Sequence, residues 1–294
     1  MPDGRQTLRR AGCLWNDAVV VSDTEIARGP VQQSGRSAAA WWRTRLGWDR
    51  YHWWHEVVII AVGYAIYTVI RDTVPAQRSI AFANAHQIVH LEQRLGVYHE
   101  RVLNAAIAPI PWLANICDYW YATTHFAVTI GVGVWIIWRH PRLSRSLRIT
   151  WYSMNLFALV GFAFYPLAPP RFLPSFVDTI MKYGIWGSVG KAANADGASN
   201  QFASMPSMHM GWATWSGVVI VVVASRWWVK ALGVAYPLIT FLVVLGTGNH
   251  YVLDVAGGLV ALLLGFVTSV VITRHGPFQP EPERSPPAGS PAPA

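Results

Sequence analysis

Between Asp254 and Thr273 the chain reads DVAGGLVALLLGFVTSVVIT, in which the first residue is the only charged one. A helix of this length is long enough to cross a hydrocarbon core of roughly 30 Å. Comparable apolar runs lie near residues 54–70, 119–138, 148–165, 207–224 and 231–248. We therefore predict an all-α integral membrane protein with six transmembrane helices, the last of them over residues 254–273.

The composition agrees with a bilayer environment, because 53% of the residues are hydrophobic and only 13% are charged. The formal net charge of +8 raises the alternative of nucleic-acid binding. However, the arginines lie between the apolar runs, and pairs such as Trp53-Trp54 and Trp227-Trp228 lie at the ends of those runs. That distribution is typical of topology signals and interfacial aromatic belts, so we predict a membrane protein with no nucleic-acid partner.

The chain divides into three parts, of which residues 51–275 form the predicted six-span catalytic membrane domain. Residues 1–50, with eight arginines, are predicted to be a disordered basic arm, and residues 276–294 a Pro-rich disordered tail. Between the first two spans, apolar residues recur at helical spacing among charged ones: Ile80, Ala83, Ile88, Leu91 and Leu95. This pattern predicts an amphipathic helical segment that lies against the membrane and covers the substrate entrance.

Lys and Arg are distributed unevenly between alternate loops. The arm, the turns at 139–148 and 225–230 and the tail hold sixteen of them, whereas the other three loops hold seven. Because basic loops stay in the cytoplasm, we predict a plasma membrane protein with cytoplasmic N and C termini. The loops 71–118, 166–206 and 249–253 then face outward, on the extracytoplasmic side.

Three polar clusters lie at the predicted outward ends of the spans, at residues 165–172, 202–209 and 247–254. In the third, His250 and Asp254 are one helical turn apart on one face. A carboxylate there can accept the imidazole Nδ1 proton and leave Nε2 as a nucleophile. The alternative is an interfacial histidine beside an aspartate that only caps a helix.

The second cluster opens a predicted helix with Ser207 and His209 in its first residues. Free backbone N–H groups at such an end favour an anionic phosphate, to which the Ser207 hydroxyl can add a donor. His209 would then protonate the leaving oxygen. An ordinary Ser-Pro helix start that needs no ligand is the alternative.

Further phosphate contacts are predicted for Arg171 and Asn249. Arg171 follows a rigid Pro-Pro pair where a span ends, and its guanidinium can bind phosphate oxygens bidentately. An arginine that only meets lipid headgroups is the alternative. Lys182 and Lys191 lie in the same loop and have the pattern of solvated charges, although Lys182 remains a candidate for a headgroup contact.

A second polar group lies on the predicted second span, where Asp118, Tyr121 and His125 fall at i, i+3 and i+7 on one helix face. Intramembrane ionisable residues usually line a cavity or pair with each other. These residues, together with Tyr251, are therefore predicted to contact the headgroup or the hydroxyls of an acceptor. A structural pairing of Asp118 with His125 is the alternative.

Two motifs resemble those of the type-2 phosphatidic acid phosphatase superfamily, over roughly residues 55–273. Pro206-Ser-Met-His209 is similar to the family's Pro-Ser-Gly-His, and His250-Tyr-Val-Leu-Asp254 is similar to its His-x-x-x-Asp. Asn249-His-Tyr251 after Thr247-Gly248 resembles the inositol phosphorylceramide synthase-like (inositolphosphotransferase) branch. The resemblance implies a six-helix fold in which His250 attacks phosphorus, Asp254 orients it and His209 protonates the leaving alcohol, without a metal or cofactor.

The chain also departs from the family pattern. Val243 and Val244 stand where family phosphatases usually have Ser-Arg, and Met208 replaces the motif glycine. Fewer cations disfavour a phosphomonoester, which carries about −1.5 to −2 charges. We therefore predict a lipid phosphotransferase that moves a phospho-headgroup from a phosphodiester lipid to a hydroxyl acceptor such as an inositol- or sugar-containing molecule. A lipid or polyprenyl phosphate phosphatase, and a non-catalytic transporter with a histidine relay, are the alternatives.

Overall fold

The computed structural model describes residues 78–184 and 201–280, together with isolated helical positions between 58 and 69. Within these ranges the regular secondary structure is helical, and one isolated β-bridge joins Leu167 and Ala203. The elements are α3 (Arg78–Leu95), α4 (Glu100–Ile107), α5 (Pro111–Tyr119), η2 (Trp120–Thr124), α6 (His125–Arg139), α7 (Pro141–Phe164), η3 (Pro170–Phe172), α8 (Thr179–Tyr183), α10 (Met208–Val223), α11 (Trp227–Gly246) and α12 (Val252–Thr273).

Four helical segments in the described ranges are long and apolar enough to cross a membrane: Pro111–Arg139, Pro141–Phe164, Trp227–Gly246 and Val252–Thr273. The helix α10 is also apolar but shorter. Most of the first predicted span, residues 54–70, lies outside the described residues, although Val62 and Ile66 within it are helical and exposed. The all-α class is therefore confirmed with four candidate spans, and the number six stays a prediction.

Two of the predicted span boundaries were wrong. The helix α7 begins at Pro141 rather than near residue 148, so the predicted turn at 139–148 shrinks to the residue His140. Proline suits the first helical position because its missing N–H would have no partner there. The segment predicted from 119 begins at Pro111, because α5 continues through the π-helical turn η2 into α6.

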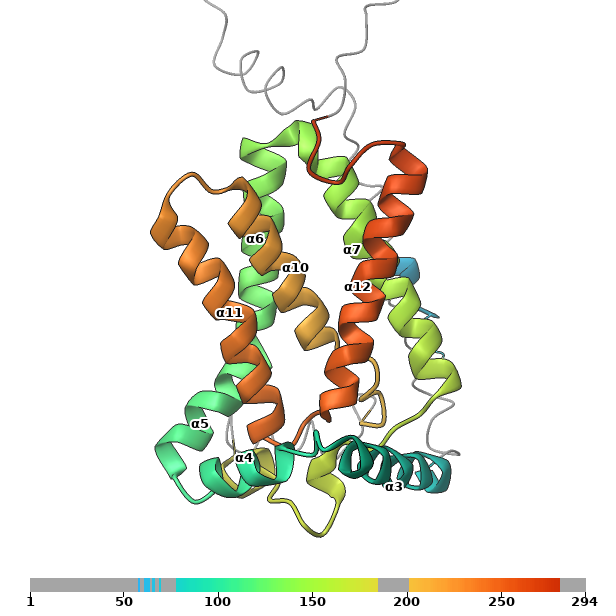
Figure 1. Cartoon of the computed structure of the whole chain (residues 1–294), viewed down its shortest axis with the longest axis vertical. Helices are drawn as coiled ribbons and strands as arrows, with labels where there is room; N and C mark the ends of the chain where they lie inside the picture. Colours follow the sequence, from blue (N-terminus) through green and yellow to red (C-terminus); the bar gives the residue numbers. More distant parts are fainter. Residues whose placement is uncertain are drawn as a thin grey trace, which may run out of the picture.

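The long helices form a bundle, with α3 and α4 lying across one end of it (Figure 1). The helix α12 packs mainly on α7, and α10 packs mainly on α11. The second pair approaches closely because Gly217 faces Gly233: a Cβ on Gly217 would meet the Gly233 carbonyl oxygen at 2.5 Å. Small residues at such crossings allow membrane helices to pack by van der Waals contact.

The helix α3 presents a different face to the protein from the one that the apolar pattern suggests. Its buried residues are Ala81, Ala85, Ile88 and Glu92. By contrast Ile80, Leu91 and Leu95 are 52%, 45% and 58% exposed. The exposed apolar side chains remain free to contact lipid, while a glutamate lies on the side that packs against the bundle.

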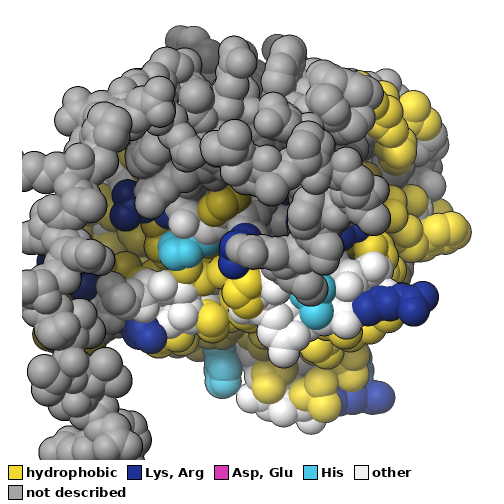
Figure 2. All heavy atoms as spheres, turned by 90° about the horizontal axis from the view of Figure 1, so that it is seen from above, with side chains coloured by type: hydrophobic (Ala, Val, Ile, Leu, Met, Phe, Trp, Pro, Cys, Tyr) yellow, Lys and Arg dark blue, Asp and Glu magenta, His cyan; other side chains and the backbone are white. Residues whose placement is uncertain are grey.

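The two ends of the bundle differ in charge. At the end where α6 meets α7 and α10 meets α11 lie Arg139, Arg142, Arg145, Arg148, Arg226, Lys230 and Arg274. The acidic residues of the described ranges belong to the elements and loops of the other end: Glu92, Glu100, Asp118, Asp178 and Asp254. Figure 2 views the molecule onto the basic end, and no acidic side chain is visible among its coloured atoms.

The first residues of the predicted tail pack against the bundle. The Ser146 hydroxyl donates a hydrogen bond of 2.8 Å to the carbonyl oxygen of Pro277. The ring of Phe278 lies 6.0 Å from that of Phe266 on α12. The predicted arm, residues 1–50, and residues 281–294 lie outside the described residues.

Candidate active site

The three polar clusters predicted at the outward ends of the spans come together at the end of the bundle that carries α3 and α4. The first cluster meets the second through the Leu167 N–H, which donates to the Phe202 carbonyl at 2.8 Å. It meets the third through the Arg171 N–H, which donates to the Gly248 carbonyl at 2.7 Å. These backbone hydrogen bonds join loops that are far apart in the chain.

The second and third clusters also contact each other directly, where α10 and α12 begin. The Ser207 N–H donates to the Asp254 carbonyl oxygen at 2.8 Å. Gly258 allows this approach, because a Cβ there would clash with the Ser207 carbonyl oxygen. The first turns of the two helices that carry His209 and His250-Asp254 are thereby held side by side.

Gly248 shapes the turn that carries His250. Its φ is 68°, a left-handed conformation that glycine adopts without steric cost. A Cβ at this position would also come within 3.4 Å of the Arg171 backbone nitrogen. The turn is completed by the Val244 carbonyl, which accepts the backbone N–H groups of Asn249 and His250 at 3.1 Å each.

The buried ring of His250 is fixed through its Nδ1 atom. Nδ1 lies 3.0 Å from the Ser204 carbonyl oxygen and 3.3 Å from Asp254 Oδ2. Both partners can only accept when Asp254 is ionised, so Nδ1 must carry the proton. The other ring nitrogen, Nε2, then has a lone pair and points toward His209 Nδ1, 3.4 Å away.

His209, in the first turn of α10, is placed to donate a proton. If His250 Nε2 carries a lone pair, the His209 nitrogen that faces it forms a hydrogen bond only when it bears the hydrogen. The His209 ring is held between two others: it stacks on Tyr121 at a centroid distance of 4.0 Å and lies 4.2 Å from the His125 ring. These contacts restrict its rotation.

Asp254 collects three donors on one oxygen. Its Oδ2 accepts the Tyr251 backbone N–H at 3.0 Å, the Ser204 hydroxyl and the His250 Nδ1–H. Hydrogen bonds of this kind favour the charged form of a carboxylate. An ionised Asp254 can therefore orient His250 and stabilise the positive charge that develops on its ring.

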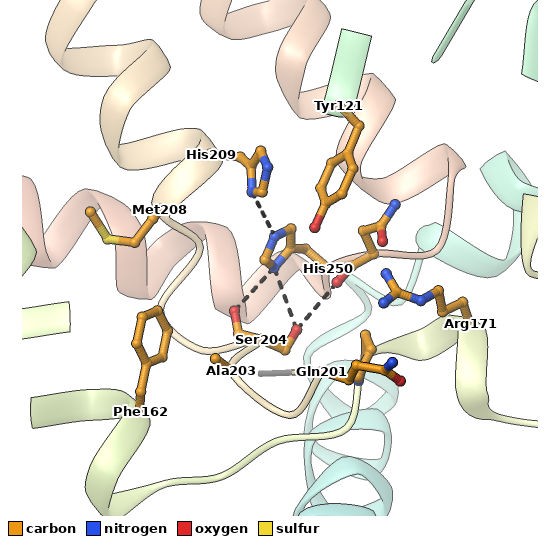
Figure 3. Close-up of a pocket in the computed structure, with 11 residues that line it drawn as sticks. Tyr121, Phe162, Arg171, Gln201, Ala203, Ser204, Met208, His209 and His250 are labelled. Carbon is orange, nitrogen blue, oxygen red and sulfur yellow. Dashed lines mark hydrogen bonds between the residues drawn. The ribbon is translucent and has the colours of Figure 1, made fainter. Parts of the chain in front are cut away.

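The two histidines open onto a cavity of about 220 Å³. Figure 3 shows Arg171 and Gln201 on one side of it, Phe162 and Met208 on another, and Ser204 beside His250. The complete lining in the described ranges is Tyr121, Phe162, Pro169, Arg171, Gln201, Ala203, Ser204, Met208, His209, Asn249 and His250. The cavity thus combines an imidazole pair and a cation with apolar side chains.

Arg171 enters the cavity from η3 and is tethered on its outer side. Its Nε lies 3.6 Å from Asp178 Oδ2, and its guanidinium carbon lies 4.9 Å from the centre of the Phe172 ring. Asp178 is itself fixed, because its Oδ1 accepts the Met181 N–H at 3.0 Å as the N-cap of α8. Neither contact occupies the terminal guanidinium nitrogens, which can therefore bind a phosphate.

The other two residues predicted to bind phosphate have structural partners. The Ser207 hydroxyl oxygen accepts the Met210 N–H at 3.4 Å as the N-cap of α10, and Ser207 does not line the cavity. Asn249 does line it, but its amide nitrogen donates to Thr247 Oγ1 at 2.7 Å. The atom of Asn249 without a partner is the carbonyl Oδ1.

Of the residues predicted to contact an acceptor, Tyr121 lines the cavity and the others do not. Asp118 accepts the Thr179 hydroxyl at 2.7 Å, and His125 packs behind His209, so the structure gives no pairing between Asp118 and His125. Lys182 donates to the Ala108 carbonyl at 3.3 Å, away from the cavity.

Tyr251 is also absent from the lining, although it follows His250 directly. Its hydroxyl is fully buried and donates to the Ala168 carbonyl at 3.0 Å. Burial and the nearby Asp254 charge raise the pKa of this hydroxyl, so it keeps its proton. Tyr251 therefore stabilises the loop and does not form part of the cavity wall.

Ser204 is the main site residue that sequence reasoning missed. It lies in the second cluster, but the serine that opens the helix, Ser207, seemed the better donor. The structure places Ser204 in the cavity wall, with its hydroxyl on Asp254 and its carbonyl on His250. Nothing in the local pattern signals this role, because its partners are 46 and 50 residues away.

Ser204→Ala is expected to lower kcat by about tenfold with little change in KM, because it removes one hydrogen bond to a buried carboxylate. The measurement is steady-state turnover of a lipid phosphate ester by the purified protein. Ser216→Ala is the matched control, since Ser216 is buried on α10 and meets Thr129 instead of the cavity. A Ser204→Ala variant with the same kcat as the control would contradict this role.

A bundle of long apolar helices with an imidazole pair, a carboxylate and an arginine at one end defines an integral membrane enzyme. Residues 86–268 match the family model described as the PAP2 superfamily. The chain belongs to this superfamily, whose enzymes are of the phosphatase or phosphotransferase type. A lipid phosphate substrate is implied by that membership. Searches of curated proteins and of solved structures found no match.

The site contains no arrangement of ligands that a metal would need, as far as the described ranges show. Within 78–184 and 201–280, no group of three or more His, Cys, Asp and Glu side chains is placed to hold a metal ion. The three neighbouring rings of His125, His209 and His250 instead contact one another or Tyr121.

Proposed function

We propose that this protein is a lipid phosphotransferase that works through a phosphohistidine on His250. The observation that carries the proposal is the pairing of two rings that line the cavity, with His250 Nε2 3.4 Å from His209 Nδ1. A nucleophile and a general acid adjacent to one phosphate-sized cavity are what stepwise phosphoryl transfer requires.

In the first half of the reaction, the phosphodiester enters between the two rings and replaces their direct contact. The Nε2 lone pair attacks phosphorus, and the bond from phosphorus to the lipid oxygen breaks. His209 enters the step as imidazolium, gives its Nδ1 proton to that oxygen and becomes neutral, so the lipid leaves as a neutral alcohol. Asp254 stabilises the positive charge on the His250 ring, and Arg171 binds the phosphoryl oxygens.

In the second half, the hydroxyl of an acceptor occupies the place of the departed lipid. His209, now without its proton, takes the acceptor's proton as the oxygen attacks phosphorus. The bond between phosphorus and Nε2 breaks, which regenerates His250, while the proton taken from the acceptor leaves His209 ready for the next cycle. The unpartnered Oδ1 of Asn249 and the ring of Tyr121 are the groups that we propose to contact the acceptor.

The charge of the cavity supports a diester in preference to a monoester. Among the described lining residues, Arg171 is the one Lys or Arg side chain. Val243 and Val244, where family phosphatases usually have Ser-Arg, are 5% and 0% exposed and belong to the core side of α11. One fixed cation matches the single charge of a diester better than the higher charge of a monoester.

The finer assignments follow from the same motifs. We propose membership in the inositolphosphotransferase branch, on the basis of Asn249-His250-Tyr251, with an inositol- or sugar-containing acceptor. The basic end of the bundle supports a plasma membrane orientation in which that end faces the cytoplasm. The cavity, at the other end, would then face the extracytoplasmic side, with α3 and α4 covering its approach.

The test is to incubate the purified protein, in vesicles, with labelled phosphatidylinositol or labelled phosphatidic acid in parallel, with and without a hydroxyl acceptor. We expect acceptor-dependent loss of the diester, release of diacylglycerol and transfer of the label to the acceptor. Release of inorganic phosphate from phosphatidic acid without an acceptor, together with an inert diester, would identify a phosphatase instead. Arg171→Lys is an informative variant, because it keeps the charge but loses bidentate geometry.

A further inference from the structure

Two fully buried carboxyl groups lie behind the nucleophile loop and play no part in the chemistry described above. Glu92 on α3 and Glu100 at the start of α4 are each 0% exposed. Neither forms an ion pair with Lys or Arg within the described part of the chain. Buried glutamates without a cation are rare, because desolvation strongly disfavours their charged form.

Glu92 reaches from α3 to the first turn of α12. Its Oε1 accepts the Leu253 backbone N–H at 2.6 Å. Leu253 lies between His250 and Asp254, and its N–H is one of the donors that a helix start leaves without an intrahelical acceptor. A side chain from another helix therefore completes the cap of the helix that carries the catalytic carboxylate.

The remaining carboxyl oxygens of the pair, Glu92 Oε2 and both oxygens of Glu100, have no hydrogen-bond partner among the described groups. The two carboxyls are neighbours, and after burial the nearby Glu100 is the largest cause that raises the pKa of Glu92. Glu100 is the natural site of the negative charge, because it stands in the first turn of α4 where the helix dipole favours anions.

We propose that Glu92 is a positioning residue that fixes the His250–Asp254 segment through the Leu253 N–H. Its Oε1 atom caps α12 and thereby ties α3 to the first turn of that helix. The helix α4 is anchored on the other side of the loop, where its Asn104 Nδ2 donates to the Gly246 carbonyl oxygen of α11 at 3.0 Å. This proposal depends on the proposed function only because turnover is the activity that is measured.

Ionisation of Glu92 would oppose this arrangement. Among the described residues, the titratable groups that face it are Glu100 from α4, Asp254 and Tyr251 from the start of α12, and Tyr98 between α3 and α4. None of them is a cation, so a second negative charge would be repelled by Glu100 and Asp254. Burial, followed by the contact with Glu100, raises the pKa of Glu92 to about 9.

The test compares Glu92→Gln with Glu92→Ala. An amide reproduces the neutral carboxyl, because its oxygen still accepts from Leu253 and the side chain carries no charge. We expect Glu92→Gln to stay within about threefold of wild type at pH 7, since no hydrogen bond is lost. Glu92→Ala should lose about 10- to 100-fold in kcat at unchanged KM, because a small displacement of a nucleophile is costly.

The pH profile separates positioning by a neutral pair from a purely structural role. The wild-type kcat is expected to fall above about pH 9, where Glu92 loses its proton. Glu92→Gln cannot lose this proton and should keep its activity there. Gln93→Ala, the exposed neighbour on α3, is the control and should follow the wild-type profile.

Stability provides a readout that does not depend on turnover. The folded protein keeps the Glu92 proton up to about pH 9, whereas the unfolded chain releases it near the ordinary value of 4.5. Raising the pH through this interval therefore weakens the wild-type fold, because the folded state binds more protons than the unfolded one. The melting temperature of Glu92→Gln should fall less between pH 6 and 9 than that of wild type, all in the same detergent.

Three results would overturn the proposal: full activity of Glu92→Ala, equal losses for the alanine and glutamine variants, or identical pH profiles of wild type and Glu92→Gln. If Glu92→Ala does not fold, the pH profiles of wild type and Glu92→Gln still test the proposal. Each assay uses a diester and a monoester lipid. Should only the monoester react, the transferase proposal fails, while the variant-to-wild-type ratios on the monoester still test Glu92.

Discussion

His250→Ala is expected to abolish turnover, with a loss of at least about 10⁴-fold in kcat, because it removes the nucleophile itself. The same variant should form no phosphoenzyme. The wild-type intermediate would carry a phosphorus–nitrogen bond, which is labile in acid and stable in base. The measurement is retention of label on the protein after a rapid quench in base, with turnover recorded in parallel.

The control for this variant is His140→Ala. His140 lies between α6 and α7 at the basic end of the bundle, where its ring contacts Trp135. We expect it to keep both turnover and phosphoenzyme formation. If His250→Ala retained near-normal activity, or if label stayed on that variant, the nucleophile would be another residue and the mechanism proposed above would be wrong.

His209→Ala should have an effect that depends on the leaving group. With an alkyl leaving group, loss of the general acid is expected to cost about 10²- to 10⁴-fold in kcat. A phenol of low pKa leaves without protonation, so the loss with a nitrophenyl diester that carries the same headgroup should be much smaller. The checking measurement is kcat for the two diesters with wild type and variant.

Tyr121→Phe serves as the comparison for His209→Ala. It keeps the ring that stacks on His209 at 4.0 Å but removes the hydroxyl. A loss of kcat that is caused by altered binding or packing should then be equal for the two diesters. Equal losses of His209→Ala for the phenol and the alkyl leaving group would count against an acid role for His209.

The helical class follows from the sequence because an apolar run such as residues 254–273 can satisfy its own backbone hydrogen bonds in a bilayer by forming a helix. The helix ends do not follow from it. The predicted start of α7 near residue 148 was placed after the arginines, yet Arg142 and Arg145 lie within the helix. Long basic side chains can extend from a helix end to water, so hydropathy alone does not place the first turn.

At the site, a contact between residues close in the sequence could be predicted, whereas contacts between distant segments could not. The helical interval between His250 and Asp254 predicts their contact, and the structure gives it at 3.3 Å. The approach of His209 to His250 depends on how α10 and α12 pack, so the sequence could place both at the outward ends of spans without giving their contact. Ser204 and Ser207 could not be ranked from the sequence, because the cap of α10 uses one of them and the cavity uses the other.

Glu92 was missed for a reason that periodicity could have revealed. The buried positions of α3 are 81, 85, 88 and 92, which is one continuous helical stripe. The apolar residues Ile80, Leu91 and Leu95 outweighed this stripe in the hydrophobic pattern because they are larger than the alanines that pack against the bundle. A glutamate in line with small residues was therefore a usable sign of a buried acid.

The π-helical turn at Trp120–Thr124 makes the length of its helix critical. Such a turn holds one residue more than an α-helical turn. Removing one residue there would restore the α-helical register and rotate α5 against α6 by about 100°. Either Asp118 would lose Thr179, or Tyr121 would lose His209. Deletions in this segment should thus be far less tolerated than substitutions, and the extra residue is a fixed element of the site's geometry.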